Sequence, residues 1–128
     1  MSTITPIVPY RDLRAAIDFL CDAFAFERHA LHEDSEGNLI HVELRLGDDF
    51  IMPTEPREAA AGGVPIPLGS EHQLYVAVED ADAHHDRANA AGAEIVMTLR
   101  DTDHGSRDYS ARDPEGNTWY FGTYRPGA

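Results

Sequence analysis

Apolar and polar residues alternate along this chain in short blocks, and two further blocks repeat with the period of a helix. Residues 3–10 predict a first strand, which Pro6 and Pro9 place at a sheet edge or beside irregular pairing, because proline has no backbone donor. Asp12 is a typical N-cap residue, and the apolar spacing after it predicts a helix over about 13–25. The residues that carry this helical period are Leu13, Ala16, Ile17, Leu20 and Phe24.

The rest of the first half predicts three more strands. Two strands over residues 27–34 and 39–46 are joined by a turn at residues 35–38, and a third strand covers residues 50–54. Residues 55–70 then contain three prolines and three glycines, which predict a long loop because both residue types interrupt regular structure. We expect this loop either to close over a site or to serve as a simple linker.

The same order of elements begins again at Gln73. Asp80 is a second typical N-cap residue, and Gly92 ends the helix that follows it. The turn Asp113–Asn117 carries proline and glycine, and the strand after it is rich in aromatic and β-branched residues, as a hairpin requires. The predicted elements are strands over residues 73–78, 93–99, 107–112 and 118–124 and a helix over residues 81–91.

An internal repeat relates the two halves. Asp12 and Asp80 precede the two predicted helices, and Gly37 and Gly105 lie in corresponding turns; the members of each pair are 68 positions apart. One half of about 55–60 residues is marginal as an independent fold, so the halves are expected to bury a shared core. The sequence does not decide whether the two halves pair within one chain or are swapped between the two chains of a dimer. We predict one domain over residues 1–128, with module 1 over about 1–56, a linker over about 57–70 and module 2 over about 71–128.

Composition and charge narrow the range of partners. The chain has 128 residues and a net charge of −13, so it would repel phosphate backbones and no nucleic-acid partner is expected. No apolar run approaches the roughly 20 residues of a membrane helix, and the first residues lack the pattern of a signal peptide. We therefore expect a cytoplasmic protein with no membrane partner. The single cysteine, Cys21, excludes an internal disulfide and a multi-cysteine zinc site, and it suits a small core position.

Three segments make the chain resemble a known family. They are VPYRDLRAAIDFL, YVAVEDADAHHDRANAAGAEI and RDPEGNTWYFGTY, and they lie in a strand–helix–strand–strand–strand unit that occurs twice. This arrangement resembles the vicinal oxygen chelate superfamily, which includes glyoxalase I, bleomycin-resistance proteins and extradiol dioxygenases. The resemblance implies a homodimer and an α+β fold, in which two βαβββ modules form a curved, cup-shaped mixed β-sheet with the helices outside. It does not fix the function, because one fold can serve many activities.

The resemblance also implies where a metal would be bound. In metal-dependent members, each module supplies one ligand seven residues before the acidic helix cap and one ligand, usually glutamate, in the last strand. These positions correspond to Thr5 and Met52 in module 1 and to Gln73 and Tyr120 in module 2. None of the four is histidine or glutamate, whereas catalytic divalent metals prefer imidazole and carboxylate donors. We therefore expect no metal and no cofactor.

Two histidines leave an alternative open. A shift of one residue would replace Gln73 by His72, although such a shift turns every side chain of a strand to the opposite face. His41 can face the cup in the predicted register. Whether His41 or His72 contributes to an unusual metal site is undecided by the sequence.

The other histidines form no recognisable ligand pattern. His84 and His85 are sequential on a helix, so they cannot chelate as an i, i+4 pair would, and we expect them on a solvated helix face. His29 and His32 have opposite parity and would point to different faces of a regular strand.

Alternation within the strands predicts the remaining site residues. The face that includes the four ligand-equivalent positions is apolar and aromatic with a few polar groups, which suits a small organic ligand. Trp119 and Phe121 have the opposite parity and are expected in the core. The predicted ligand-binding residues are Thr5, Phe50, Met52, Gln73, Tyr75, Tyr120 and Tyr124.

The leading hypothesis is a small-molecule-binding protein of the glyoxalase/bleomycin-resistance type. It would lack the superfamily metal site and hold an apolar or cationic organic ligand in the sheet cup, as the resemblance to bleomycin-resistance-like proteins implies. The alternative is a metal-dependent lyase, isomerase or dioxygenase of the glyoxalase type, and a third class is an accessory dimer without catalysis. No catalytic residue is predicted, and the sequence favours binding over catalysis without deciding between them.

Overall fold

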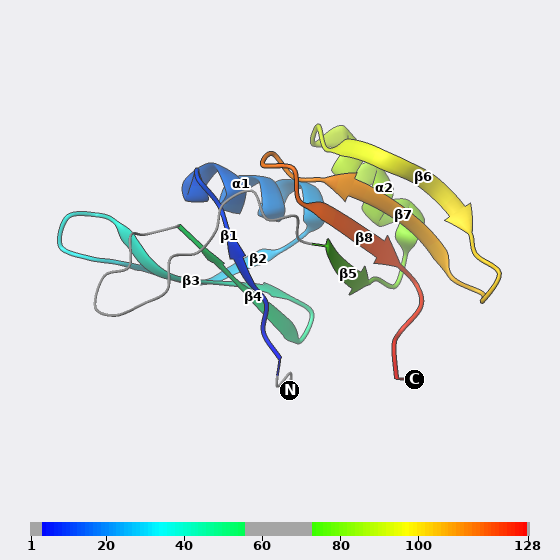
Figure 1. Ribbon diagram of the computed structural model, residues 1–128, viewed down its shortest axis with the longest axis horizontal. Helices are drawn as coiled ribbons and strands as arrows, with labels where there is room; N and C mark the ends of the chain where they lie inside the picture. Colours follow the sequence, from blue (N-terminus) through cyan, green and yellow to red (C-terminus); the bar gives the residue numbers. More distant parts are fainter. Residues whose placement is uncertain (1–3, 56–72, 128) are drawn as a thin grey trace. The chain divides into compact units, whose positions relative to one another are not determined.

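The computed structural model describes residues 4–55 and 73–127, and it has the predicted α+β fold with two βαβββ modules (Figure 1). The chain divides into two compact units: the first holds four strands and most of the first helix, and the second holds Asp22–Phe24 and the chain from residue 73 onward. The predicted linker over about 57–70 and His72 lie outside the described residues. Neither helix in the described ranges has the length and apolar character needed to cross a membrane.

The first unit is a four-stranded mixed sheet with the strand order β1-β4-β3-β2, which can be followed by its labels in Figure 1. β1 pairs in parallel with β4, and the other neighbours are antiparallel. β1 is shorter than the predicted strand over residues 3–10, because Pro6 precedes it and Pro9 ends it, and proline lacks the backbone donor that pairing requires. The elements are β1 (Ile7–Pro9), α1 (Leu13–Phe24), β2 (Glu27–Glu33), β3 (Leu39–Leu46) and β4 (Asp49–Thr54).

The two faces of this sheet differ in burial. One face carries Val8, Val42, Leu44 and Ile51, and together with the apolar stripe of α1 it forms the core of the unit. The free thiol of Cys21 is buried in α1, as predicted. The opposite face keeps part of its surface accessible, and we call it the first open face. It carries Ile7, His41, Glu43, Phe50, Met52 and Thr54.

The second unit repeats this arrangement with the strand order β5-β8-β7-β6, in which β5 is parallel to β8. Trp119 and Phe121 are fully buried, as their parity predicts, and Phe24 packs against both with ring centroids 5.5 Å and 4.8 Å away. β8 is shorter than the predicted strand over residues 118–124, so Tyr124 lies beyond its end. The elements are β5 (Gln73–Ala77), α2 (Ala81–Ala90), β6 (Glu94–Asp101), β7 (Arg107–Arg112) and β8 (Thr118–Gly122).

The internal repeat is present in the hydrogen bonds of both units. The Asp12 carboxylate accepts from the Ala15 N–H at 3.1 Å, and the Asp80 carboxylate accepts from the Ala83 N–H at 3.0 Å, so both aspartates cap their helices as predicted. Gly37 and Gly105, at the predicted corresponding turns, have φ values of 84° and 85°, which glycine adopts without strain.

The strand register follows the same offset. Ile7 is paired with Met52 in the first unit, and Tyr75 is paired with Tyr120 in the second. Both members of the second pair stand 68 positions after those of the first. The sheet positions of the two modules therefore correspond residue by residue at β1 and β5 and at β4 and β8.

Candidate functional site

The four positions that the family resemblance assigns to a metal lack suitable donors. Met52 offers only a thioether and lies beside Ile7, and Tyr120 offers a phenol and lies beside Tyr75. Thr5 precedes β1, and Gln73 is an exposed residue at the start of β5. This donor set does not fit a catalytic divalent cation, which takes imidazole or carboxylate ligands. Across residues 4–55 and 73–127, moreover, no group of three or more His, Cys, Asp or Glu side chains is arranged to hold a metal ion.

The face of the second unit that corresponds to the first open face is called the second open face. It is aromatic, and hydrogen bonds between polar groups hold its side chains in place. It carries Tyr75, which is 39% exposed, and the half-buried Tyr120 on the neighbouring strand. The Tyr75 hydroxyl donates to the Tyr124 carbonyl at 2.6 Å, and the Tyr124 N–H donates to the Ser106 hydroxyl oxygen at 3.0 Å. The Ser106 hydroxyl in turn donates to the Asp108 carboxylate. Partial burial raises the pKa of the Tyr75 phenol, so the phenol keeps its proton at neutral pH.

Gly122 makes this network possible. A side-chain carbon at this position would overlap with the Asp108 carboxylate and would lie 2.7 Å from the Tyr75 hydroxyl oxygen. The missing side chain therefore leaves the space in which Asp108 and Tyr75 approach each other. Hydrogen bonds connect the Tyr75 hydroxyl through Tyr124 to Ser106, so the Tyr75 ring is held in one orientation.

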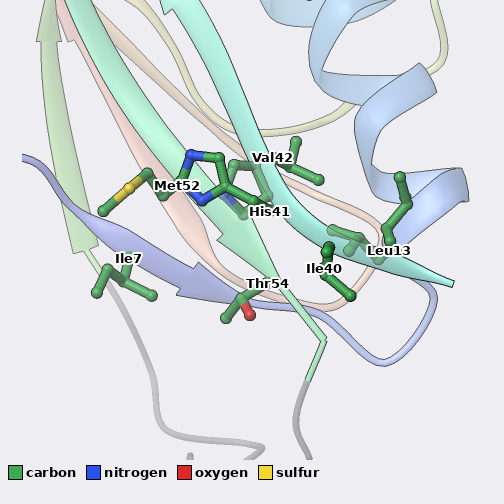
Figure 2. Close-up of a pocket in the computed structure, with 9 residues that line it drawn as sticks. Ile7, Leu13, Ile40, His41, Val42, Met52 and Thr54 are labelled. Carbon is green, nitrogen blue, oxygen red and sulfur yellow. The ribbon is translucent and has the colours of Figure 1, made fainter. Parts of the chain in front are cut away.

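The first open face contains a small hollow (Figure 2). Ile7, Met52 and Thr54 line it from β1 and β4, and His41 lines it from β3, as their labelled side chains in Figure 2 show. The hollow is also lined by Leu13 of α1, by Leu39, Ile40 and Val42 of β3 and by Pro53 of β4. The hollow has a volume of about 170 Å³. Ligand pockets commonly have roughly 300–1,000 Å³, so this hollow can take one ring or a short alkyl group of a larger molecule.

Three histidines gather beside this hollow around one carboxylate. His41 Nε2 lies 2.7 Å from a Glu43 carboxylate oxygen, and His29 Nε2 lies 3.9 Å from the other. The His32 and His41 rings are 5.7 Å apart, and the His29 ring contacts the Phe50 ring at 4.9 Å. His41 thus lies on the open face, where the sequence allowed it.

The prediction that His29 and His32 point to different faces is wrong. The register of β2 against β3 shifts between Arg28 and Ala30, so His29 is an extra residue in the pairing. This bulge resets the alternation and leaves both histidines near Glu43. A strand irregularity of this kind has no clear signature in one sequence, which is why parity alone failed.

The prediction that His84 belongs to a solvated helix face is also wrong. His84 is 9% exposed, its Nε2–H donates to the Phe24 carbonyl at 2.9 Å, and its Nδ1 accepts from the Tyr109 hydroxyl. The carbonyl can only accept, which fixes this tautomer. Ala81, His84 and Ala88 are buried at the spacing of one helix face, and this spacing is the signal that identifies His84 as a core residue.

The predicted ligand-binding residues fall on both units. Met52 lines the hollow of the first open face, and Phe50 contacts His29 on that same face. Their role in binding stays a prediction, as does that of the five others. Sequence reasoning missed Glu43, because its position becomes informative only when the bulge brings His29 beside it. It also missed Ser106, whose hydroxyl accepts a hydrogen bond from the Tyr124 N–H. In the second unit, Gln73 and Tyr75 lie on β5, Tyr120 lies on β8 and Tyr124 follows β8. In the first unit, Thr5 precedes β1.

Comparison with known proteins gives a consistent set of relatives. The model of the Glyoxalase/Bleomycin resistance protein/Dioxygenase superfamily matches residues 3–121. TioX from Micromonospora sp. ML1 is 31% identical, with a TM-score of 0.82 over 98% of this chain and 100% of that one. An uncharacterised protein of Mycobacterium bovis is 32% identical over 123 residues, which cover 93% of this chain and 81% of the relative. Lactoylglutathione lyase from Agrobacterium tumefaciens has a TM-score of 0.72 over 95% of this chain and 93% of its own, but at 23% identity it shows the shared fold alone.

Proposed function

We propose, from the premise that this chain belongs to the Glyoxalase/Bleomycin resistance protein/Dioxygenase superfamily, that it binds a small apolar or cationic organic molecule without the metal of its metal-dependent relatives. The observation that carries this proposal is the donor set at Thr5, Met52, Gln73 and Tyr120. A thioether and a phenol replace the carboxylates that would complete a divalent site. Side chains of this kind offer apolar and aromatic contact instead.

Both open faces support binding over metal chemistry. Tyr75 and Tyr120 are neighbours on parallel strands and present aromatic surface with polar tips, and Met52 beside Ile7 presents flexible apolar surface. The polar groups around them are few and lie in fixed places, as a pocket for a small molecule requires.

Replacement of Met52 tests the proposal. We predict that Met52→Ala weakens binding of an aromatic ligand about tenfold, because the hollow loses one of its larger apolar side chains. The measurement is calorimetric titration of the purified protein with a panel of aromatic and cationic molecules, followed by the same titration of the variant with each ligand that binds.

Leu31→Ala is the matched control. Leu31 is also apolar and partly exposed in the first unit, but its side chain is not among those that line the hollow. Leu31→Ala should leave the affinity unchanged. Silence across the whole panel, or an equal loss in both variants, would contradict the proposed function.

A further inference from the structure

In the part of the chain that the structure describes, the Glu43 carboxylate has two histidine partners. His41 contacts one of its oxygens at 2.7 Å and His29 approaches the other at 3.9 Å, while the Glu43 side chain keeps 32% of its surface exposed. Histidine carries a positive charge only when protonated, which for an ordinary imidazole occurs below about pH 6.5. Among the described residues, the side chains that contact the Glu43 carboxylate are therefore not permanently charged cations.

The other charged groups on this face do not neutralise the Glu43 carboxylate. β2 contributes Glu27, His29 and His32, and β3 contributes His41 and Arg45. The Arg45 guanidinium contacts the Glu27 carboxylate at 2.6 Å, so the nearest permanent cation is engaged elsewhere. β4 presents Phe50, Met52 and Thr54 to this face, and β1 presents Ile7, none of which carries a charge.

The carboxylate adjoins the apolar hollow. His41 both lines the hollow and contacts Glu43, so the two features share a wall. Phe50, which contacts the His29 ring, adds an aromatic surface beside the carboxylate. A carboxylate next to an aromatic ring is a favourable environment for an organic cation, because both attract positive charge.

We propose that Glu43 anchors the ammonium group of the ligand and that the apolar part of the same ligand occupies the hollow beside Ile7 and Met52. This inference rests on the proposed function and specifies its ligand as a primary or secondary organic amine. The amine takes the place that a protonated imidazole would occupy beside the carboxylate.

The charge properties of the protein agree with this assignment. The hydrogen bond from His41, and then the nearby charges of His41, His29 and His32, lower the pKa of Glu43, so its carboxylate is ionised throughout the neutral range. The net charge of −13 adds a long-range attraction for cations, which salt weakens.

A pair of matched probes tests the assignment. Benzylamine is cationic and benzyl alcohol is its neutral counterpart of nearly equal size, and binding of each is followed by NMR titration at fixed ionic strength. At about pH 7.5 we expect the wild-type protein to bind benzylamine about tenfold more tightly than benzyl alcohol.

Two substitutions assign the preference to Glu43. Glu43→Gln keeps the size of the side chain and should abolish the preference for benzylamine at neutral pH. Glu27→Gln removes a carboxylate of the same face that is already paired with Arg45, and it should retain the preference.

The outcomes separate this inference from the proposed function. Equal binding of both probes to the wild-type protein, or an unchanged preference in Glu43→Gln, would overturn the role of Glu43 and leave small-molecule binding standing. Saturable binding of Zn²⁺ alone, with shifts at His29, His41 and Glu43, would identify the cluster as a metal site and overturn both. Absence of binding by either probe and by every other aromatic or cationic molecule would also overturn both.

Discussion

The two ring nitrogens of His84 link α2 to β7 and to the last residue of α1. It lies in α2, accepts from Tyr109 of β7 and donates to Phe24 at the end of α1. Burial lowers the pKa of His84 despite the hydrogen bond to the Phe24 carbonyl, and burial likewise raises the pKa of the Tyr109 phenol. Both groups are therefore neutral in the folded protein at pH 7, and the charged form of His84 is disfavoured in the core.

This burial predicts a loss of stability in acid. An unfolded histidine takes up a proton below about pH 6.5, whereas folded His84 resists protonation until a lower pH, so the free energy of unfolding falls between these two values and then levels off. We predict that the acid-dependent fall is reduced in His84→Gln, measured by urea unfolding from about pH 7 to about pH 5. At neutral pH this variant should also lose about 1–3 kcal/mol, because the Tyr109 and Phe24 groups lose a well-placed partner.

His104→Gln serves as the control for this prediction. His104 is exposed in the turn between β6 and β7, so its replacement should leave both the stability at neutral pH and the acid slope close to those of the wild-type protein. A full acid slope in His84→Gln would show that other groups cause the transition.

At the scale of elements, two turns with the same residue pattern have unequal structural roles. Asp34 accepts from the N–H groups of Glu36 and Asn38, both at 2.9 Å, in the exposed turn between β2 and β3. Asp113 makes the corresponding bonds in the turn between β7 and β8, but it is 5% exposed and also accepts from the Trp119 indole N–H at 3.1 Å. The second turn is thus fastened to the core, and the first is not.

This difference predicts unequal costs for the same substitution. Asp113→Ala should lower the free energy of unfolding by at least about 2 kcal/mol, because Trp119 and Asn117 are left buried with unmet hydrogen bonds. Asp34→Ala should cost less than about 1 kcal/mol, because water can replace an exposed acceptor. Urea unfolding followed by circular dichroism measures both, and equal losses in the two variants would show that burial of the turn is not the cause.

Much of the element structure was predictable because it depends on local chemistry. Asp12 and Asp80 cap helices through their own side chains, and Gly37 and Gly105 take a backbone conformation that their turns require, so the sequence states these features directly. The β2 bulge at His29 depends on pairing with β3, which is a contact between separate segments. The local sequence pattern therefore does not predict the bulge. The same limit applies to the site: the parity of Met52 and Tyr120 followed from alternation, whereas the position of Glu43 beside His29 required the fold.

At the scale of the whole molecule, the family and the donor chemistry lead to different expectations for metal. The chain matches the superfamily over residues 3–121, and its pairing register repeats between the two units. Yet the four positions that would complete a metal site carry threonine, methionine, glutamine and tyrosine. The central claim is that this member uses the fold to bind an organic molecule and does not use it to present a divalent cation.

The metal content of the protein tests this claim most directly. Protein purified without chelator is incubated with an equimolar mixture of Zn²⁺, Ni²⁺, Mn²⁺ and Fe²⁺, desalted and analysed for its elements. The account predicts far less than one metal ion per chain, because imidazole and carboxylate donors are missing from the four positions. One retained ion of any of these metals per chain would contradict it.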